Sequence, residues 1–134
     1  MNKNKHKWLK EYQSICEEIE YLEYKLIKTE RELKRWESGD LSKLKLEKDS
    51  NASQLESIVK TTRHELEYKI EEKEELIILV SKFKGLNNQI LRMKYIEDKN
   101  LYEIALDLNF SVGYIQQRHA ELKRMLGVLD EMDL

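Results

Sequence analysis

The sequence predicts an all-α protein with a long, coiled-coil-like N-terminal helical hairpin followed by a C-terminal helix-turn-helix module. The first observation is composition: the 134 residues include no proline and only four glycines, so few residues interrupt a helix. The second is the heptad spacing of apolar residues in the first 84 residues. The third is a pair of short amphipathic helices joined by a tight turn. We therefore expect a hairpin over residues 1–84 and a separate domain over residues 85–134.

The first long helix is predicted over Lys3 to Ser38, with Gly39 as its C-terminal stop. Its apolar residues alternate at spacings of three and four, the heptad pattern of helices that pack together. Glu and Lys occupy the remaining faces, so this apolar seam must be buried against a partner. The seam consists of Trp8, Tyr12, Ile15, Ile19, Leu22, Leu26, Thr29, Leu33 and Trp36, and only Thr29 interrupts it.

A second long helix is predicted from a capping box at Ser53 and Glu56 to about Lys84. The preceding segment, Leu41 to Ala52, is ambiguous, although Asp49-Ser50-Asn51 favours a loop. Two long helices joined by a loop most simply form an antiparallel hairpin, but an intermolecular coiled coil would bury the same faces. The predicted apolar positions are Leu55, Val59, Leu66, Ile70, Ile77 and Val80, and Arg63 and Lys73 interrupt them.

Three shorter helices are predicted after Gly85, where we place the domain boundary. The first covers Leu86 to Glu97 and is expected to begin with Asn87 as its N-cap. The second begins with a capping box of Asn100 and Glu103. Its apolar stripe is Leu101, Ile104, Ala105 and Leu108.

The turn between the last two helices has a residue suited to each of its positions. Asn109 tolerates a left-handed backbone better than other non-glycine residues. Phe110 is expected to be an apolar plug, and Ser111 supplies the N-cap hydroxyl of the last helix. Ala105 is small, as needed where two crossing helices approach closely. The buried face of the last helix is predicted to be Val112, Ile115, Leu122 and Leu126, with His119 at a further inward-facing position.

The opposite face of the last helix has the composition of a DNA recognition helix. It is polar, aromatic and small, and it has no acidic residue before Glu121. A major groove accepts one helix, whose amides and hydroxyls can recognise base edges. The residues that we assign to base reading are Ser111, Gly113, Tyr114, Gln116 and Gln117.

Positive charge is scarce in the predicted DNA-binding domain. Residues 86–134 carry six basic and eight acidic side chains, although non-specific DNA affinity depends on cations that neutralise phosphates. One copy should therefore bind DNA weakly, and useful affinity would need two copies or a partner already on the DNA. The candidates for contacts with the DNA backbone are Arg92, Lys94, Lys99, Arg118, Lys123 and Arg124.

This part of the chain resembles region 4 of the sigma-70 family. The resemblance rests on the run Ile90-Leu91-Arg92-Met93-Lys94-Tyr95-Ile96-Glu97 and on the pattern Leu101-x-Glu103-Ile104-Ala105-x-x-Leu108-Asn109-x-Ser111. It covers about Leu86 to Leu126 and departs from the family at Asn109, where glycine is usual. The whole arrangement is similar to small sigma-region-4-like phage and prophage regulators, including the late activators related to RinA and ArpU. The resemblance implies binding of double-stranded DNA, control of late or packaging genes, and an N-terminal part that sets the oligomeric state or contacts RNA polymerase.

Other chemistry is not indicated by the sequence. His6, His64 and His119 share no metal-ligand spacing with Cys16, and there is no glycine-rich phosphate loop. We therefore expect no metal, no cofactor and no enzymatic activity. The single cysteine rules out a disulfide framework, which fits a reducing cytoplasm. No apolar run approaches the ~18 residues of a membrane span, and no signal peptide is recognisable, so no membrane partner is expected.

We therefore expect a cytoplasmic, sequence-specific transcription regulator that forms a homodimer through its N-terminal half. A homodimer would bury the apolar seam and would present two weak recognition helices to one duplex. One alternative is a small terminase subunit, which also joins a helix-turn-helix to oligomerising helices but usually has the DNA-binding module first. Another is a coiled-coil protein-interaction module. Particle size separates a transcription regulator from a terminase subunit: a ring of about eight or more copies favours a terminase, whereas a monomer or dimer favours a regulator.

Overall fold

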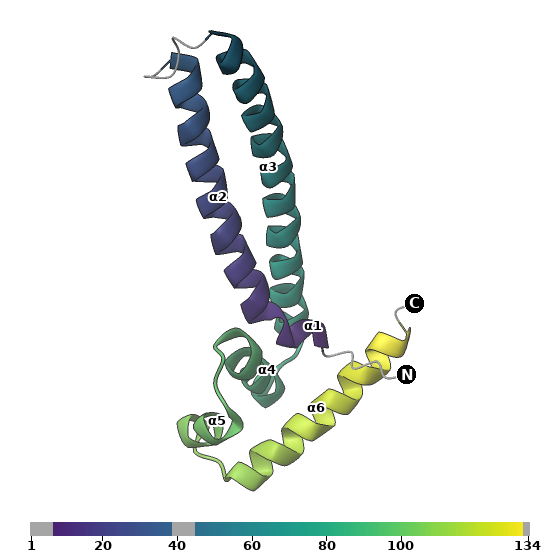
Figure 1. The fold of residues 1–134 in the computed structure, drawn as a ribbon. Helices are drawn as coiled ribbons and strands as arrows, with labels where there is room; N and C mark the ends of the chain where they lie inside the picture. Colours follow the sequence, from purple (N-terminus) through teal and green to yellow (C-terminus); the bar gives the residue numbers. More distant parts are fainter. Residues whose placement is uncertain (1–6, 39–44, 133–134) are drawn as a thin grey trace. The chain divides into compact units, whose positions relative to one another are not determined.

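All secondary structure in the part of the chain that the structure describes, residues 7–38 and 45–132, is helical (Figure 1). This computed structural model confirms the predicted all-α class for those residues. None of the helices described there is both long enough and apolar enough to cross a membrane. In chain order the elements are α1 (Lys7–Lys10), α2 (Tyr12–Ser38), α3 (Lys45–Ser81), α4 (Gly85–Leu91), a π-helix η1 (Arg92–Ile96), α5 (Leu101–Leu108) and α6 (Val112–Met132).

The chain divides into two compact units. The helical-pair unit is Cys16–Glu72, and the C-terminal unit combines Met1–Ile15 with Lys73–Leu134. The C-terminal unit thus includes the first turn of α2 and the last turns of α3 as well as α4 to α6. The sequence-based division into residues 1–84 and 85–134 stays a prediction.

In the helical-pair unit, α2 and α3 lie side by side and run in opposite directions (Figure 1). Two ion pairs define the antiparallel order: Glu18 near the start of α2 pairs with Lys69 at 3.1 Å, and Glu30, further along α2, pairs with Arg63, earlier in α3. The hydrogen bond with Glu18 is the largest of the effects that raise the pKa of Lys69. The buried residues of this unit are Ile19, Leu22, Val59 and Thr62.

The predicted first helix is interrupted near its start. A turn at Glu11 separates α1 from α2, and α2 ends at Ser38 as expected. Of the predicted seam, Tyr12, Ile15, Ile19 and Leu22 are buried. The seam becomes partly exposed towards the end of α2, at Leu26, Thr29, Leu33 and Trp36. The predicted stop at Gly39, the first residues of the predicted helix and the side chain of Trp8 lie outside the described part.

The second long helix begins earlier than predicted. Because α3 starts at Lys45, the capping box at Ser53 does not open it, and Asp49-Ser50-Asn51 lies inside the helix. Polar residues of this kind cost only ~0.5 kcal/mol each in a helix interior, and the segment contains neither glycine nor proline. These weak preferences did not break the helix.

The predicted apolar positions of α3 were only partly right: Val59 and Val80 are buried as expected, but other inward-facing positions were missed. Thr62 is completely buried and Leu76 is 4% exposed, whereas Ile77 is 40% exposed and Arg63 is also exposed. Continuing the heptad alternation from Val59 gives Thr62, Leu66, Lys69, Lys73, Leu76 and Val80. Two of these positions are lysines, which cover apolar neighbours with their methylene chains while the ammonium stays in water. The sequence pattern therefore hid the inward-facing positions.

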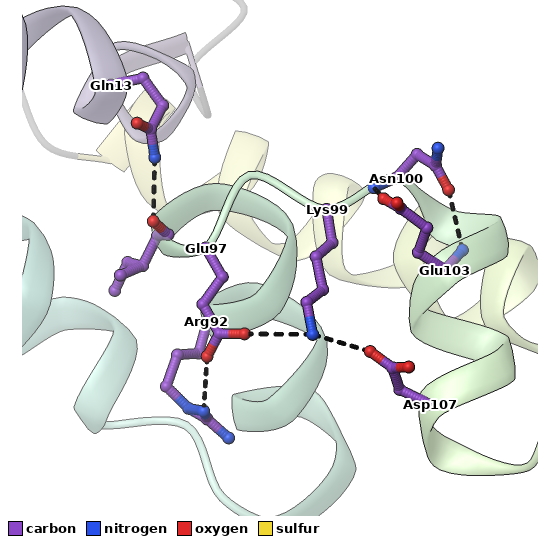
Figure 2. Close-up of polar contacts among 8 residues, drawn as sticks. Gln13, Arg92, Glu97, Lys99, Asn100, Glu103 and Asp107 are labelled. Atoms are coloured by element: carbon purple, nitrogen blue, oxygen red, sulfur yellow. Dashed lines mark hydrogen bonds and ion pairs between the residues drawn. The ribbon is translucent and has the colours of Figure 1, made fainter.

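The core of the C-terminal unit draws on both ends of the chain. Leu9 of α1 is 1% exposed, and the side-chain amide of Gln13 donates a 2.9 Å hydrogen bond to the Ile96 carbonyl (Figure 2). Segments more than 80 residues apart in sequence are thus joined in one unit. Its buried residues are Leu9, Tyr12, Ile15, Leu76, Val80, Ile90, Leu91, Met93, Tyr95, Ile104, Ala105, Ile115, His119, Leu122 and Leu126.

The connection from α3 to α4 differs in detail from the sequence-based expectation. Gly85 has φ +57°, a left-handed conformation that favours glycine. The expected cap at Asn87 was wrong, because α4 begins at Gly85 after Lys84, with no side-chain cap. Asn88 instead donates through its side-chain amide to the Val80 carbonyl near the end of α3, at 2.9 Å. The Val80 carbonyl, one of the last four of α3, thus accepts from this amide as well as from the Phe83 amide at 3.2 Å.

The predicted helix over Leu86 to Glu97 changes its winding in the middle. After α4, the π-helix η1 covers Arg92–Ile96, and the Glu97 amide donates to the Arg92 carbonyl at 2.9 Å. Asp98 then takes a left-handed conformation with φ +60° and leads to Asn100. Single π-helical turns are rare and often occur at functional sites.

Candidate nucleic-acid interface

The start of α5 is fixed by the capping box expected from sequence. The Glu103 amide donates to the Asn100 side chain at 2.8 Å, and the Asn100 amide donates to the Glu103 carboxylate at 2.9 Å (Figure 2). Two amides that the first turn of a helix leaves free are therefore satisfied. Ile104 and Ala105 are buried as predicted.

The turn after α5 also follows the sequence-based prediction in its backbone. Asn109 has φ 64° and ψ 40°, and the Phe110 amide donates to the Ala105 carbonyl at 3.0 Å. With the Asn109 amide directed at Leu106, this is a Schellman motif. Ser111 then caps α6, because its hydroxyl accepts a hydrogen bond from the Tyr114 amide at 3.1 Å.

Phe110 is not the apolar plug that was expected. Its side chain is exposed, and its ring lies against that of Tyr114, with centroids 5.1 Å apart. The αL residue before it turns the chain outward, so Phe110 packs on the first turn of α6 instead of in the core. The two rings form an exposed aromatic pair beside the predicted base-reading residues.

The inner face of α6 holds it in the C-terminal unit. Ile115, Leu122 and Leu126 are buried as predicted, whereas Val112 is partly exposed. His119, which lies between Ile115 and Leu122 in the sequence, is also buried. Its Nε2 shares a 2.8 Å hydrogen bond with the Tyr95 hydroxyl of η1. A polar side chain is tolerated in this core because it has a partner.

Replacement of Tyr95 tests this link between η1 and α6. Tyr95→Phe is expected to lower the free energy of unfolding by about 1–3 kcal/mol at neutral pH, because a buried hydrogen-bond partner of His119 is lost. Tyr102→Phe is the matched control, because Tyr102 is exposed. The measurement is urea denaturation followed by circular dichroism. Equal stability of the two variants would show that the Tyr95 hydroxyl contributes nothing.

The same pair of variants has a predicted pH dependence. Burial raises the pKa of Tyr95 from 10.0 to about 12, so the folded state favours the neutral phenol. The resulting stabilisation is complete below the unfolded pKa and is lost as the pH rises through the folded value. Part of the loss of stability of the parent protein between about pH 10 and pH 12 should therefore be missing in Tyr95→Phe and present in Tyr102→Phe.

The residues assigned to base reading are all exposed on the first turns of α6. Their surroundings favour an anion, because the first turn of α6 contains no acidic residue and a helix N-terminus carries partial positive charge. The Ser111 hydroxyl already accepts one hydrogen bond but still has its donor hydrogen. The exposed set is Ser111, Gly113, Tyr114, Gln116 and Gln117.

Two of the cations that were predicted to contact the DNA backbone belong to an ion-pair network. Arg92 lies 3.0 Å from the Glu97 carboxylate, and Lys99 lies 2.7 Å from Asp107 and 3.6 Å from Glu97 (Figure 2). The hydrogen bond with Asp107 is the main cause of the raised pKa of Lys99. The four charges sum to zero, so Arg92 and Lys99 are poorer candidates for phosphate contacts than their exposure suggests.

The remaining cations differ in how they are held. Arg118 donates to the Asn87 side chain at 2.6 Å, which ties α6 to α4. The Lys94 ammonium lies 6.0 Å from the centre of the Tyr95 ring. Lys123 and Arg124 are exposed, and neither forms an ion pair with another residue of the described part. They are therefore the cations on α6 most available to a phosphate.

The carboxylates of the network were missed in the sequence analysis. Glu97 follows Arg92 by five residues, a spacing that brings no side chains together on an α-helix. In the structure, η1 separates Arg92 from Glu97 and the left-handed Asp98 separates Glu97 from Lys99, and neither feature has a recognisable sequence pattern. Alternating charges at Arg92, Glu97 and Lys99 were the only available signal.

No metal site is formed by His, Cys, Asp and Glu within residues 7–38 and 45–132. The geometry of the candidate interface is that of a surface with exposed amides, an aromatic pair and a few cations. Comparison of the chain with protein-family models, with curated proteins and with solved structures gave no match.

Proposed function

We propose that this protein is a sequence-specific, DNA-binding transcription regulator of phage or prophage type, with no enzymatic activity. In this proposal α5 and α6 form a helix-turn-helix, and α6 is the recognition helix. The observation that carries the proposal is the exposed face of the first turns of α6, which is capped by Ser111, has no acidic residue in its first turn and presents Gln116 and Gln117. The protein would act on double-stranded DNA in the cytoplasm.

The dimensions and chemistry of α6 suit the major groove. An α-helix with its side chains is about 10–12 Å wide, and the groove of B-DNA is about 12 Å wide. Residues in the first turns of a recognition helix contact base edges, and glutamine can bind adenine through two hydrogen bonds. Gly113 adds no side chain to the exposed surface, so the backbone can approach the DNA closely there.

The resemblance of Leu86–Leu126 to sigma-70 region 4 supports this proposal from the sequence. By that resemblance, late or packaging genes are the expected targets. The N-terminal helical hairpin would then set the oligomeric state or contact RNA polymerase. Selection of bound sites from random DNA tests the proposal directly, because enrichment of one short sequence is expected. A selection that enriches no sequence would reject a sequence-specific regulator.

Gln116→Ala and Gln117→Ala test the base-reading assignment. Each is expected to reduce discrimination against a single wrong base pair by about 1–3 kcal/mol, because a bidentate amide contact is lost. Binding to unrelated DNA and the melting temperature should change little, since both side chains are exposed. Gln54→Ala, at an exposed position of α3, is the control. If both α6 variants discriminate as the parent does, this face of α6 does not contact bases.

Lys123→Ala with Arg124→Ala tests the contacts with the DNA backbone. The double variant should weaken binding to all sequences about equally and should reduce the slope of log affinity against log salt by about 2, one unit for each lost phosphate contact. Lys82→Ala is a control at an exposed lysine outside the proposed interface. A salt dependence equal to that of the parent would remove Lys123 and Arg124 from the interface.

A further inference from the structure

The outward face of α2 has an ordered pattern of charge that the proposed DNA contacts do not use. Seven residues of this face, all exposed, change along the helix from acidic to apolar to basic. Heptad geometry places them on the side away from the seam. We call them the outer α2 face: Glu17, Glu20, Tyr21, Tyr24, Ile27, Lys28 and Arg31.

The apolar centre of this face is unusual for a solvent-exposed helix. Tyr21, Tyr24 and Ile27 are 60%, 63% and 53% exposed, and they follow one another on adjacent turns. Of the exposed large apolar residues of α3 in the same unit, Tyr68 lines a hollow together with Tyr21, and Ile58 stands ten positions earlier. Scattered apolar residues are normal on a surface, whereas a contiguous patch with a charged rim is typical of a protein interface.

The charges of the outer α2 face are symmetric in position and opposite in sign about Tyr24. Glu17 precedes Tyr24 by seven residues and Arg31 follows it by seven. Glu20 precedes it by four and Lys28 follows it by four. Tyr21 and Ile27 stand three residues away on either side. If a second identical helix packs antiparallel with Tyr24 at the two-fold axis, each acidic residue of this face therefore lies opposite a basic residue of the other helix. Each flanking apolar residue lies opposite an apolar residue.

We propose that the outer α2 face is the homodimer interface of this protein, and that a second copy of the chain docks on it antiparallel. The predicted contacts are Glu17 with Arg31, Glu20 with Lys28 and Tyr21 with Ile27, each made twice. A two-fold interface must be self-complementary, and this face meets that condition. Tyr24 of each copy lies at the centre, where Lys28 already stands 6.0 Å from the Tyr24 ring within the chain.

This interface is distinct from the one expected from the sequence alone. That expectation placed a homodimer on the apolar seam, but Ile19 and Leu22 of the seam are buried within the helical-pair unit. A dimer formed through the seam would have to separate α2 from α3. A dimer formed through the outer α2 face leaves the ion pairs of Glu18 with Lys69 and of Glu30 with Arg63 intact.

Charge reversal tests the proposal on the full chain. The parent is expected to dimerise reversibly, with a Kd on the order of 1–100 µM as for a weak, transient interface, measured by sedimentation equilibrium. Glu17→Lys with Glu20→Lys makes the face wholly basic, and Lys28→Glu with Arg31→Glu makes it wholly acidic. Each double variant should raise the Kd at least ~10-fold, because like charges then meet at four contacts.

The rescue experiments separate an interface from general destabilisation. Mixing the two double variants should form a heterodimer with an affinity near that of the parent, because acid then meets base at every contact. The variant with all four reversals should again form a homodimer. Lys60→Glu with Glu67→Lys, at exposed positions of α3, is the matched control and should dimerise as the parent does. Circular dichroism of each variant checks that helix content is kept.

The opposite results overturn the proposal. A parent that stays monomeric at ~100 µM would show that this face binds a different partner or remains in water. A dimer of unchanged Kd in both double variants would place the interface elsewhere. Weak homodimers without recovery in the mixture or in the fourfold variant would mean that the reversals act on folding. Binding of DNA by the C-terminal unit is measured separately, so failure of the dimer leaves the proposed function open to its own tests.

Discussion

Replacing Leu9 by alanine is expected to lower the free energy of unfolding by about 2–5 kcal/mol, the range for truncating a buried leucine. Leu9 is 1% exposed although it lies in a helix of only four residues close to the N-terminus. The cost combines lost burial of the side chain with a cavity in the core of the C-terminal unit. Domains are usually stable by about 5–15 kcal/mol, so the effect should be easily measured.

Urea denaturation of Leu9→Ala and of its neighbour Lys10→Ala provides the comparison. Lys10 is exposed, so its truncation should change stability by less than ~0.5 kcal/mol. If both variants unfold at the same urea concentration, the N-terminal residues do not support the C-terminal unit. The expected difference also bears on a fragment of residues 85–134, which would lack Leu9, Tyr12, Leu76 and Val80 and the hydrogen bond from Gln13. Such a fragment should be less stable than the sequence-based boundary at Gly85 implies.

Several features that depend on a few consecutive residues were predicted correctly from the sequence. The capping box of Asn100 and Glu103, the left-handed turn at Asn109 and the cap at Ser111 are all present. Each follows from the hydrogen-bonding capacity or backbone freedom of one side chain next to a helix end. These signals mark the ends of the two helices that flank the turn, whereas the same kind of signal was wrong at Ser53 and at Asn87.

Features that depend on distant contacts were not predictable in the same way. The inward-facing positions of α3 include Lys69, which pairs with Glu18 of α2, and the apolar pattern alone assigned Ile77 instead of Leu76. Leu9 is buried in a unit whose larger part, Lys73–Leu134, lies more than 60 positions away in the sequence. A periodicity argument contains no information on such partners, because it treats one helix at a time.

The candidate site shows the same division. Exposure of Gln116 and Gln117 follows from the periodicity of α6 once Ile115 and Leu122 are assigned to the core. Whether Arg92 and Lys99 are free to contact phosphates cannot be inferred from such periodicity. Their partners Glu97 and Asp107 are positioned by η1 and by the turn before α5. Counting basic residues therefore overestimates the charge that is free to contact phosphates.

Ile115 and Gln116 offer a test in which neighbouring residues of α6 should fail for different reasons. Ile115 is completely buried, and Ile115→Ala is expected to cost about 2–5 kcal/mol of stability by leaving a cavity where α6 packs in the C-terminal unit. Gln116 is exposed, so Gln116→Ala should leave the urea midpoint near that of the parent. Both variants should lose preference for the selected DNA site if α6 is the recognition helix.

Temperature separates the two mechanisms. Lowering the temperature towards that of maximum stability, about 10–20 °C for typical domains, should refold much of Ile115→Ala and restore its preference for the selected site. Gln116→Ala should show the same reduced specificity at every temperature, because the lost contact does not depend on folding. Circular dichroism at each temperature gives the folded fraction with which the DNA affinity is compared. If Ile115→Ala is fully folded and still unspecific, the position of α6 depends on Ile115 in a way that burial alone does not explain. If it keeps full specificity while largely unfolded, the recognition surface lies outside α6.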